Sequence, residues 1–273
     1  MAVVSIEHVP APAPAPAHLT WRSPATGHEP SWTRPALSGW WHASDAVLPK
    51  PLPLIVGLDV EGALTGSDLV LFDLLVASAW HDIGAGKTGA FDCRVADVQR
   101  VRGVRGRDHR QLLTSLARLQ HVSVTLPLLP QTLHGQAPRT PLLIAYRLDA
   151  GSRILTWSPA PAVLAALQKV THYAKLQIGT LVKLRQRPAV LLYEILASRA
   201  AMRSKKIKLS AAQLHAFLGT TSKYPRWSSL ERQVIKPALQ RIEDYTSWQL
   251  RLEVRHEPYS RANVVEVQFS IAK

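Results

Sequence analysis

The sequence is poor in the residue that cross-links small proteins, because its 273 residues include one cysteine, Cys93. A single thiol excludes an intramolecular disulfide and a cysteine-rich zinc site. The chain also lacks an uninterrupted apolar run of about 18 residues, the length that a membrane-spanning helix needs. Its N-terminus lacks the basic start and apolar centre of a secretory signal. We therefore expect a soluble, cytoplasmic protein without a membrane partner.

Side-chain groupings that support catalysis are missing as well. No serine, cysteine or carboxylate pair stands in a pattern that would join a nucleophile to its base, and Asp92, Asp97 and Asp108 are scattered between arginines. Tyr193 lies in an apolar helical pattern, which predicts a core position. The His-hydrophobe-His pattern that a nicking enzyme of rolling-circle replication needs does not occur. We expect no enzymatic activity and no catalytic residue.

Two patterns that resemble ligand sites are incomplete. His81, His109 and His121 have neither the paired spacing of a zincin nor a cysteine to support them. Residues 84–88 end as the Gly-Lys-Thr of a phosphate loop, but His81 occupies the position of the first glycine, and the segment precedes a strand pattern. We therefore expect no metal and no nucleotide or other cofactor.

Charge is what the chain has in excess, because 33 Lys plus Arg against 19 Asp plus Glu leave a formal charge of +14. The excess is uneven: residues 166–273 hold 19 basic and 7 acidic residues, whereas residues 1–165 hold 14 and 12. A clustered positive charge favours a polyanionic partner such as nucleic acid. The alternative is a solvated basic face that only keeps the protein soluble.

The first 53 residues differ from the rest of the chain. Proline alternates with alanine over residues 10–17, and further prolines follow up to Pro53, so that helix and sheet are both obstructed. We expect a Pro/Ala-rich, disordered and flexible arm over residues 1–53. It also contains four tryptophans, Trp21, Trp32, Trp40 and Trp41, which could dock on the folded body or on a partner. The other interpretation is a tail that is ordered only locally.

From residue 54 the chain repeats itself. Phe72-Asp73-Leu74-Leu75 and Tyr193-Glu194-Ile195-Leu196 match at a separation of 121, each within an apolar helical pattern that holds one acidic residue. A strand pattern and a short helix ending in glycine follow in both copies, over residues 91–103 and 207–219. A further helix then precedes strand patterns. The same order of elements therefore occurs twice.

The strand patterns complete the two units. They cover residues 122–126, 142–148 and 153–157 in the first copy, and residues 248–255 and 264–271 in the second. Residues 256–263 form the predicted turn between the last two strands, with Arg261 at its tip. The fold class is therefore α+β, with two tandem winged-helix domains at residues 54–167 and 168–273. One α+β domain with a coincidental repeat is the alternative.

The second copy contains the best candidate for a DNA-reading helix. We expect it to begin near Trp227, with Ser228 or Ser229 as its cap and Pro237 bending it. Helical spacing places Ser229, Arg232, Gln233 and Lys236 on one face, and Leu230, Val234, Ala238 and Ile242 on the other. Cations and amides at such a helix contact phosphates and base edges. The predicted DNA-binding residues of this copy are Lys223, Arg226, Ser228, Ser229, Arg232, Gln233, Lys236 and Arg261.

The first copy offers a weaker counterpart in an arginine-rich loop. Residues 100–110 read RVRGVRGRDHR, in which glycines let the backbone bend and arginines could hold a phosphate backbone. From this run we predict Arg105, Arg107 and Arg110 as auxiliary DNA contacts. A solvated loop beside a dimer interface is the alternative interpretation.

These residues together resemble a known family. Residues 191–196 (LLYEIL), residues 207–209 (IKL), Lys223-Tyr224 and residues 234–239 (VIKPAL) are similar to the C-terminal winged helix of the iteron-binding Rep proteins, the replication initiators of theta-type plasmids. The resemblance is best over residues 173–271, is limited to layout in the first copy, and does not extend to the arm. One departure is Arg241, where such proteins often carry an acidic residue.

The resemblance implies functions that composition does not show. It implies that both winged helices bind repeated origin DNA, that the first one also mediates a monomer-dimer equilibrium, and that the dimer represses its own gene. It further implies opening of the origin and recruitment of the host replication initiator and helicase. A winged-helix transcriptional repressor without initiator activity is the alternative, and a protein-interaction module that binds an acidic partner is a third possibility.

Overall fold

The computed structural model describes residue 41 and residues 45–55, 59–61, 64–104, 109–125, 139–149, 151–168, 173–200, 202–220, 223–257 and 260–272, of which 59–61, 125 and 260–263 are described by their backbone alone. Most of the expected arm, residues 1–40 and 42–44, lies outside the described residues. Among the described residues, no helix combines the length and apolar character that a membrane-spanning segment requires.

The first repeat begins with helix α1, which starts where Thr65 forms a capping box. The Thr65 side chain accepts a hydrogen bond from the backbone of Asp68, and the Asp68 carboxylate accepts one from the backbone of Thr65. The elements of this repeat are α1 (Gly66–Gly84), β3 (Phe91–Arg94), α2 (Val95–Val101), α3 (Arg110–His121), β4 (Ser123–Thr125), β5 (Arg139–Thr140), β6 (Leu143–Leu148) and β7 (Ile154–Pro159). Strands β3, β7 and β6 form one antiparallel sheet in that order.

The second repeat has the same layout. Its elements are α6 (Arg187–Ala200), β9 (Lys206–Ser210), α7 (Ala211–Leu218), α8 (Trp227–Leu230), η3 (Glu231–Ile235), α9 (Lys236–Tyr245), β10 (Gln249–Glu257) and β11 (Ser260–Ala272). Strands β9, β11 and β10 pair in the same order as β3, β7 and β6 of the first repeat. Both the predicted repeat and the α+β fold of two winged helices are therefore confirmed.

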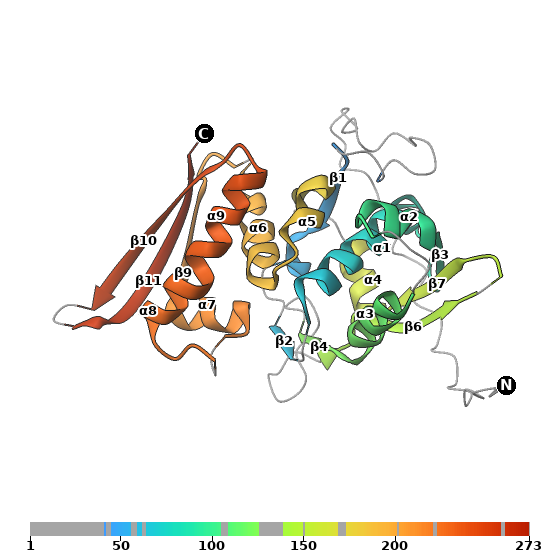
Figure 1. Ribbon diagram of the computed structural model, residues 1–273, viewed down its shortest axis with the longest axis horizontal. Helices are drawn as coiled ribbons and strands as arrows, with labels where there is room; N and C mark the ends of the chain where they lie inside the picture. The colour runs from blue at the N-terminus through green and yellow to red at the C-terminus, as the bar shows by residue number, and fades with distance from the viewer. Residues whose placement is uncertain are drawn as a thin grey trace.

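The segment before residue 54 differs from our expectation. Strand β1 (Val47–Pro51) pairs antiparallel with β8 (Tyr173–Gln177), and the turn of 3-10 helix η2 (Leu52–Leu54) follows it. Residues 47–53 are therefore part of the folded body, because the prolines leave enough backbone N–H groups free to pair at the edge of a two-stranded sheet. In Figure 1, β1 lies with α5 (Ile178–Leu184) between the second repeat at the left and the first repeat at the right.

Two short elements complete the first half. Strand β2 (Asp59–Glu61) pairs with β4, and helix α4 (Pro161–Gln168) packs against α1. Helix α1 also packs against α5 and α6, so that the two repeats share one interface of apolar helices. Tyr193 of α6 is buried there as predicted, with its hydroxyl accepting a hydrogen bond from the backbone N–H of Gln177 at 2.9 Å.

A buried ion group joins the repeats at this interface. The Lys50 ammonium of β1 lies 2.8 Å from a carboxylate oxygen of Asp73 on α1 and 2.9 Å from one of Glu194 on α6. Asp73 and Glu194 are the acidic residues that the repeat places at matching positions. Their side chains are 1% and 2% exposed, and that of Lys50 is 4% exposed. The single lysine therefore ties one carboxylate of each repeat to the N-terminal strand.

Two carboxylates beside one cation leave an excess negative charge in an apolar interior. Burial raises the pKa of Glu194 to about 8, with Lys50 opposing the shift and the Asp73 carboxylate adding to it. Burial also opposes the charge of Lys50, but the two carboxylates outweigh it and raise its pKa. The raised pKa favours the protonated form of Glu194, which would bring the group closer to electrical neutrality.

The wing of the second repeat, formed by the antiparallel strands β10 and β11, is longer than the sequence indicated. Residues 256–263 are not all turn, because β10 continues to Glu257 and β11 begins at Ser260, with register shifts around His256. Arg261 therefore lies within the start of β11 and not at the tip of a broad turn. Bulges let a strand continue past such irregular pairs by adding a local twist.

The raised pKa of Glu194 predicts a specific pH dependence of the stability of the fold. The folded state holds its proton up to a pKa of about 8, against an ordinary value of 4.5, so that this group stabilises the fold fully below pH 4.5 and loses its contribution as the pH rises through 8. We expect the urea midpoint to fall between pH 6 and pH 9 by less in Glu194→Gln than in the wild type. Equal slopes in the two proteins would contradict the proposed protonation state.

Candidate nucleic-acid interface

The predicted reading helix is not one continuous α-helix. It consists of α8, the π-helical segment η3 and α9, which together we call the reading segment. The Lys236 N–H donates to the carbonyl of Glu231 across the wider turn. Pro237 follows at once, at the start of α9. A proline lacks the N–H and crowds the carbonyl four residues before it, and prolines and π bulges are both common places where a helix is disturbed. The predicted disturbance at Pro237 thus takes the form of a π turn.

The two faces of this segment are distributed as predicted. Arg232, Gln233 and Lys236 are exposed, and Ser229 is half-buried. The predicted inner face is in the core, with Leu230, Val234, Ala238 and Ile242 all buried, together with Ile235 and Leu239. Ile235 and Leu239 widen the buried side of the segment. The exposed face therefore carries two cations and an amide, and the opposite face of the same segment is packed into the hydrophobic core.

The start of the segment corrects the predicted cap. Helix α8 begins at Trp227, but its N-cap position is Arg226, and no side chain caps it. Ser228 and Ser229 lie within the first turn, where a hydroxyl cannot occupy the cap position. Arg226 and Ser228 are exposed. Both residues are therefore available on the surface at the helix start, where unpaired backbone N–H groups also lie.

An unpredicted carboxylate organises this surface. Glu231 accepts a hydrogen bond from the Trp227 indole at 2.8 Å and pairs with the Lys236 ammonium at 2.8 Å. The hydrogen bond from Lys236 is the main reason that the pKa of Glu231 is lowered, although burial opposes the shift. Lys236 is therefore held in place over the helix by an acidic neighbour.

The remaining predicted residues fall in three groups. Lys223 is exposed on the loop between α7 and α8, and Arg110 is exposed as the first residue of α3. Arg105 and Arg107 lie outside the described residues, and Arg261 is described by its backbone in β11. The structure thus places Lys223, Arg226, Arg232 and Lys236 on or directly before the segment from α8 to α9, and Arg110 on the corresponding helix of the first repeat.

Two other arginines of the first loop are committed to the protein itself. Arg100 pairs with Asp97 at 3.3 Å. Arg102 is half-buried, and its burial lowers its pKa, whereas the nearby Asp68 carboxylate opposes that shift. This part of the arginine-rich run therefore has a structural role in addition to any contact with a ligand.

Arg241 has a packing role. Its side chain donates to the backbone carbonyls of Leu184 at 2.9 Å and of Lys183 at 3.1 Å, at the C-terminal end of α5. A cation satisfies these carbonyls and suits the negative end of the helix dipole. The residue that departs from the family pattern therefore joins α9 to α5.

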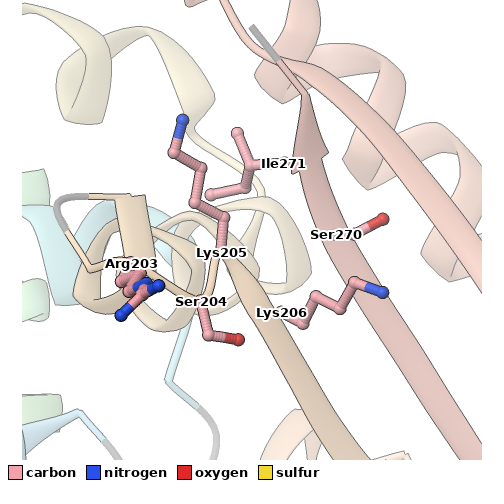
Figure 2. A pocket seen from close by; sticks show the side chains of 6 residues that line it. All are labelled: Arg203, Ser204, Lys205, Lys206, Ser270 and Ile271. Atoms are coloured by element: carbon pink, nitrogen blue, oxygen red, sulfur yellow. The ribbon is translucent and has the colours of Figure 1, made fainter.

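Sequence reasoning missed a second basic surface. A cavity of about 630 Å³ lies where β9 begins and β11 ends, away from the turn between β10 and β11. It is lined by Arg203, Ser204, Lys205, Lys206, Ser270 and Ile271. In Figure 2 the ammonium groups of Lys205 and Lys206 point to different sides instead of meeting at one point. The arrangement is a spread of positive charge, which the Arg-Ser-Lys-Lys run could have indicated.

Comparisons with known proteins agree with this fold. Residues 210–271 match the family model described as "Initiator Rep protein, WH2". The Pi initiator protein, solved in complex with iteron DNA, is 14% identical over 84% of this chain and 98% of its own, with a TM-score of 0.60. Domains 2 and 3 of RctB are 14% identical over 86% of this chain and 97% of theirs, with a TM-score of 0.44. No curated protein matches the sequence.

These matches differ in what they establish. The family match covers α7, the reading segment and the wing, and it confirms the resemblance that the sequence indicated for this region. The likeness to the Pi initiator, at 14% identity, shows a shared fold over most of the chain. The RctB likeness is too low to add to it.

The corrected cap positions predict a contrast between two serines. Ser210 caps α7 by accepting from the Gln213 backbone at 3.1 Å, whereas no cap bond involves Ser228. Ser210→Ala should lower the free energy of unfolding by about 1 kcal/mol, the usual cost of a lost cap. Ser228→Ala should leave it within about 0.5 kcal/mol, as at most surface sites. Urea denaturation of both variants tests this, and similar losses would restore the predicted serine cap of α8.

Proposed function

We propose that this chain binds the repeated origin DNA of a plasmid and initiates its replication, since residues 210–271 match the model of an initiator Rep winged-helix domain. The observation that carries the proposal is the exposed face of Arg232, Gln233 and Lys236 within the matched domain. In a winged helix, the second helix of the helix-turn-helix enters the major groove. Arginine there pairs with guanine, and glutamine with adenine.

The second repeat supplies the stronger of two unequal contacts. Residues 166–273 carry most of the net positive charge of the chain. In the first repeat, Arg110 at the start of α3 would anchor the other half of the site together with Arg105 and Arg107. Two different DNA-binding domains in one chain suit an asymmetric DNA repeat that is contacted along one side of the duplex. A simple repressor, in contrast, needs one DNA-binding domain per subunit.

The remaining roles follow from the family. In our proposal the first winged helix, over residues 54–167, mediates a monomer-dimer equilibrium, and the second, over residues 168–273, recognises the sequence. The dimer would repress the chain's own gene, and the origin-bound monomer would open the origin and recruit the host initiator and helicase. Cytoplasmic localisation and the absence of an enzymatic step belong to the same proposal.

The pattern of protected DNA distinguishes initiation from repression. We expect the full chain to protect tandem direct repeats of about two helical turns each in DNA that flanks its gene. DNase I footprinting measures this directly. A single protected palindrome would support a transcriptional repressor instead, and no protection over the flanking DNA would rule out both functions.

A substitution on the reading face separates sequence recognition from general attraction. Arg232→Ala should cost about 1–3 kcal/mol of discrimination for the protected repeat, the value of one bidentate contact with a base, and should leave binding to unrelated duplexes nearly unchanged. Lys87→Ala is the charge-matched control, because Lys87 follows the far end of α1 and pairs with Asp82. Competition binding with repeat and non-repeat DNA measures the affinity for each. Equal discrimination in Arg232→Ala and wild type would show that the DNA-reading face lies elsewhere.

A further inference from the structure

A cavity between the two repeats is lined in part by cationic residues, which lie outside the exposed face of the predicted DNA-reading helix. Its volume is about 460 Å³, and it lies where the start of α1 meets the α5–α6 loop, the end of α7 and the reading segment. The lining residues are Thr65, Gly66, Arg185, Gln186, Arg187, Pro188, Thr220, Lys223, Tyr224, Gln233, Val234 and Pro237. The lining includes three cations and no acidic residue. We call this the interdomain cavity.

The cations of the interdomain cavity lack the carboxylate partners that several other cations of this protein have, although the Lys223 ammonium lies 5.5 Å from the centroid of the Tyr224 ring. Lys50, Lys87, Arg118 and Lys236 each pair with a carboxylate. In the part of the chain that the structure describes, no side-chain hydrogen bond or ion pair involves Arg185, Arg187 or Lys223. Three such charges around one space favour an anion there.

Arg187 is the most informative of the three. It is half-buried, and this burial lowers its pKa, because no described carboxylate compensates the loss of water. Its guanidinium is held against Gly219, where an added Cβ would lie 2.7 Å from a terminal nitrogen. Gly219 has a φ of 64°, which glycine adopts without strain. The end of α7 therefore leaves room for this guanidinium beside the cavity.

The α5–α6 loop, which carries Arg185 and leads into Arg187 at the start of α6, packs closely on its surroundings. A Cβ on Gly66 would lie 2.3 Å from the carbonyl oxygen of Arg185, so that the start of α1 packs directly on the loop backbone. Arg185 itself has a φ of 53°, which is uncommon for a residue with a side chain. Strained, tightly packed loops are frequent at ligand sites. The two arginines are thus presented by a rigid support.

We propose that the interdomain cavity binds a backbone phosphate of the duplex that the reading segment contacts, with Arg187 and Arg185 as its main ligands and Lys223 at its rim. The inference rests on the proposed DNA binding and deepens it. The duplex is the occupant favoured by Gln233, which belongs both to the exposed reading face and to the lining of the cavity. A phosphate next to the bases that α8 and η3 face would therefore reach the arginines. Its position between the repeats would set the spacing of the two heads along the DNA.

The first test is the salt dependence of binding to the protected repeat. Loss of one phosphate contact reduces the slope of log K against log salt by about 1. We expect Arg187→Gln to show this reduction together with a loss of affinity of about tenfold, as for a hydrogen bond to a charged group. Lys87→Gln, matched in charge and remote from the cavity, should keep the wild-type slope. An unchanged slope in Arg187→Gln would overturn the proposal while leaving DNA binding itself intact.

The second test locates the phosphate. Duplexes with a single neutral methylphosphonate are scanned through the repeat, and one position should weaken wild-type binding but have no further effect on Arg187→Gln. If Arg187→Gln fails to fold, as judged by its urea midpoint, Lys223→Gln on the exposed loop replaces it in both tests. Additive losses at every position would show that Arg187 holds no backbone phosphate. If no duplex is bound by the wild type, the proposed function fails first.

The third test separates a DNA phosphate from a small anion. Inorganic phosphate at constant ionic strength should raise the melting temperature of the free wild type by no more than that of Arg187→Gln. A larger effect on the wild type, combined with unchanged salt slopes, would identify a site for a free phosphate compound and overturn the assignment to the duplex.

Discussion

The buried contact of Lys50 with Asp73 and Glu194 is the interaction on which the arrangement of the two winged helices depends. Helices α1 and α6 are corresponding elements of the two repeats, and each brings a carboxylate to the same apolar interface. Without a cation the two carboxyl groups would leave negative charge uncompensated in a medium that screens charge poorly. Removing one partner of a buried ion pair costs about 3–5 kcal/mol. Strand β1 is therefore a structural part of the two-domain body, although it belongs to the proline-rich segment.

The same helices position the surface proposed to bind DNA. The middle of α6 carries Glu194, and its first residue, Arg187, lines the interdomain cavity. Helix α1 carries Asp73 and, at its start, the glycine that packs on the loop of Arg185. A change in the packing of α1 on α6 would therefore move the arginines of the cavity relative to the reading segment. In our proposal, the stability of this interface and the spacing of the two winged helices along the DNA are coupled through these two helices.

Much of the fold could be predicted because it depends on patterns of residues that are close together in the sequence. Periodic apolar residues and a glycine after each short helix indicated the order of elements, and the spacing of Leu230, Val234 and Ile242 indicated which face is buried. The exposure of Arg232 and Lys236 follows from the same periodicity. The predicted serine cap of α8 was wrong, because the presence of hydroxyl residues near a helix start does not specify which of them, if any, takes the cap position. The π turn at Pro237 was expected only as a bend.

The sequence by itself determined the repeated winged helices, the excess of positive charge and the exposed basic face, because periodicity and charge are properties of neighbouring residues. Tertiary structure alone decided that Lys50 meets Glu194, 144 residues away, and that Arg241 holds the end of α5. It also decided that Arg185, Arg187 and Lys223 share one cavity. Such contacts join segments that are distant in the chain. They form only when the apolar helices pack together, and the local sequence around each residue does not specify that packing.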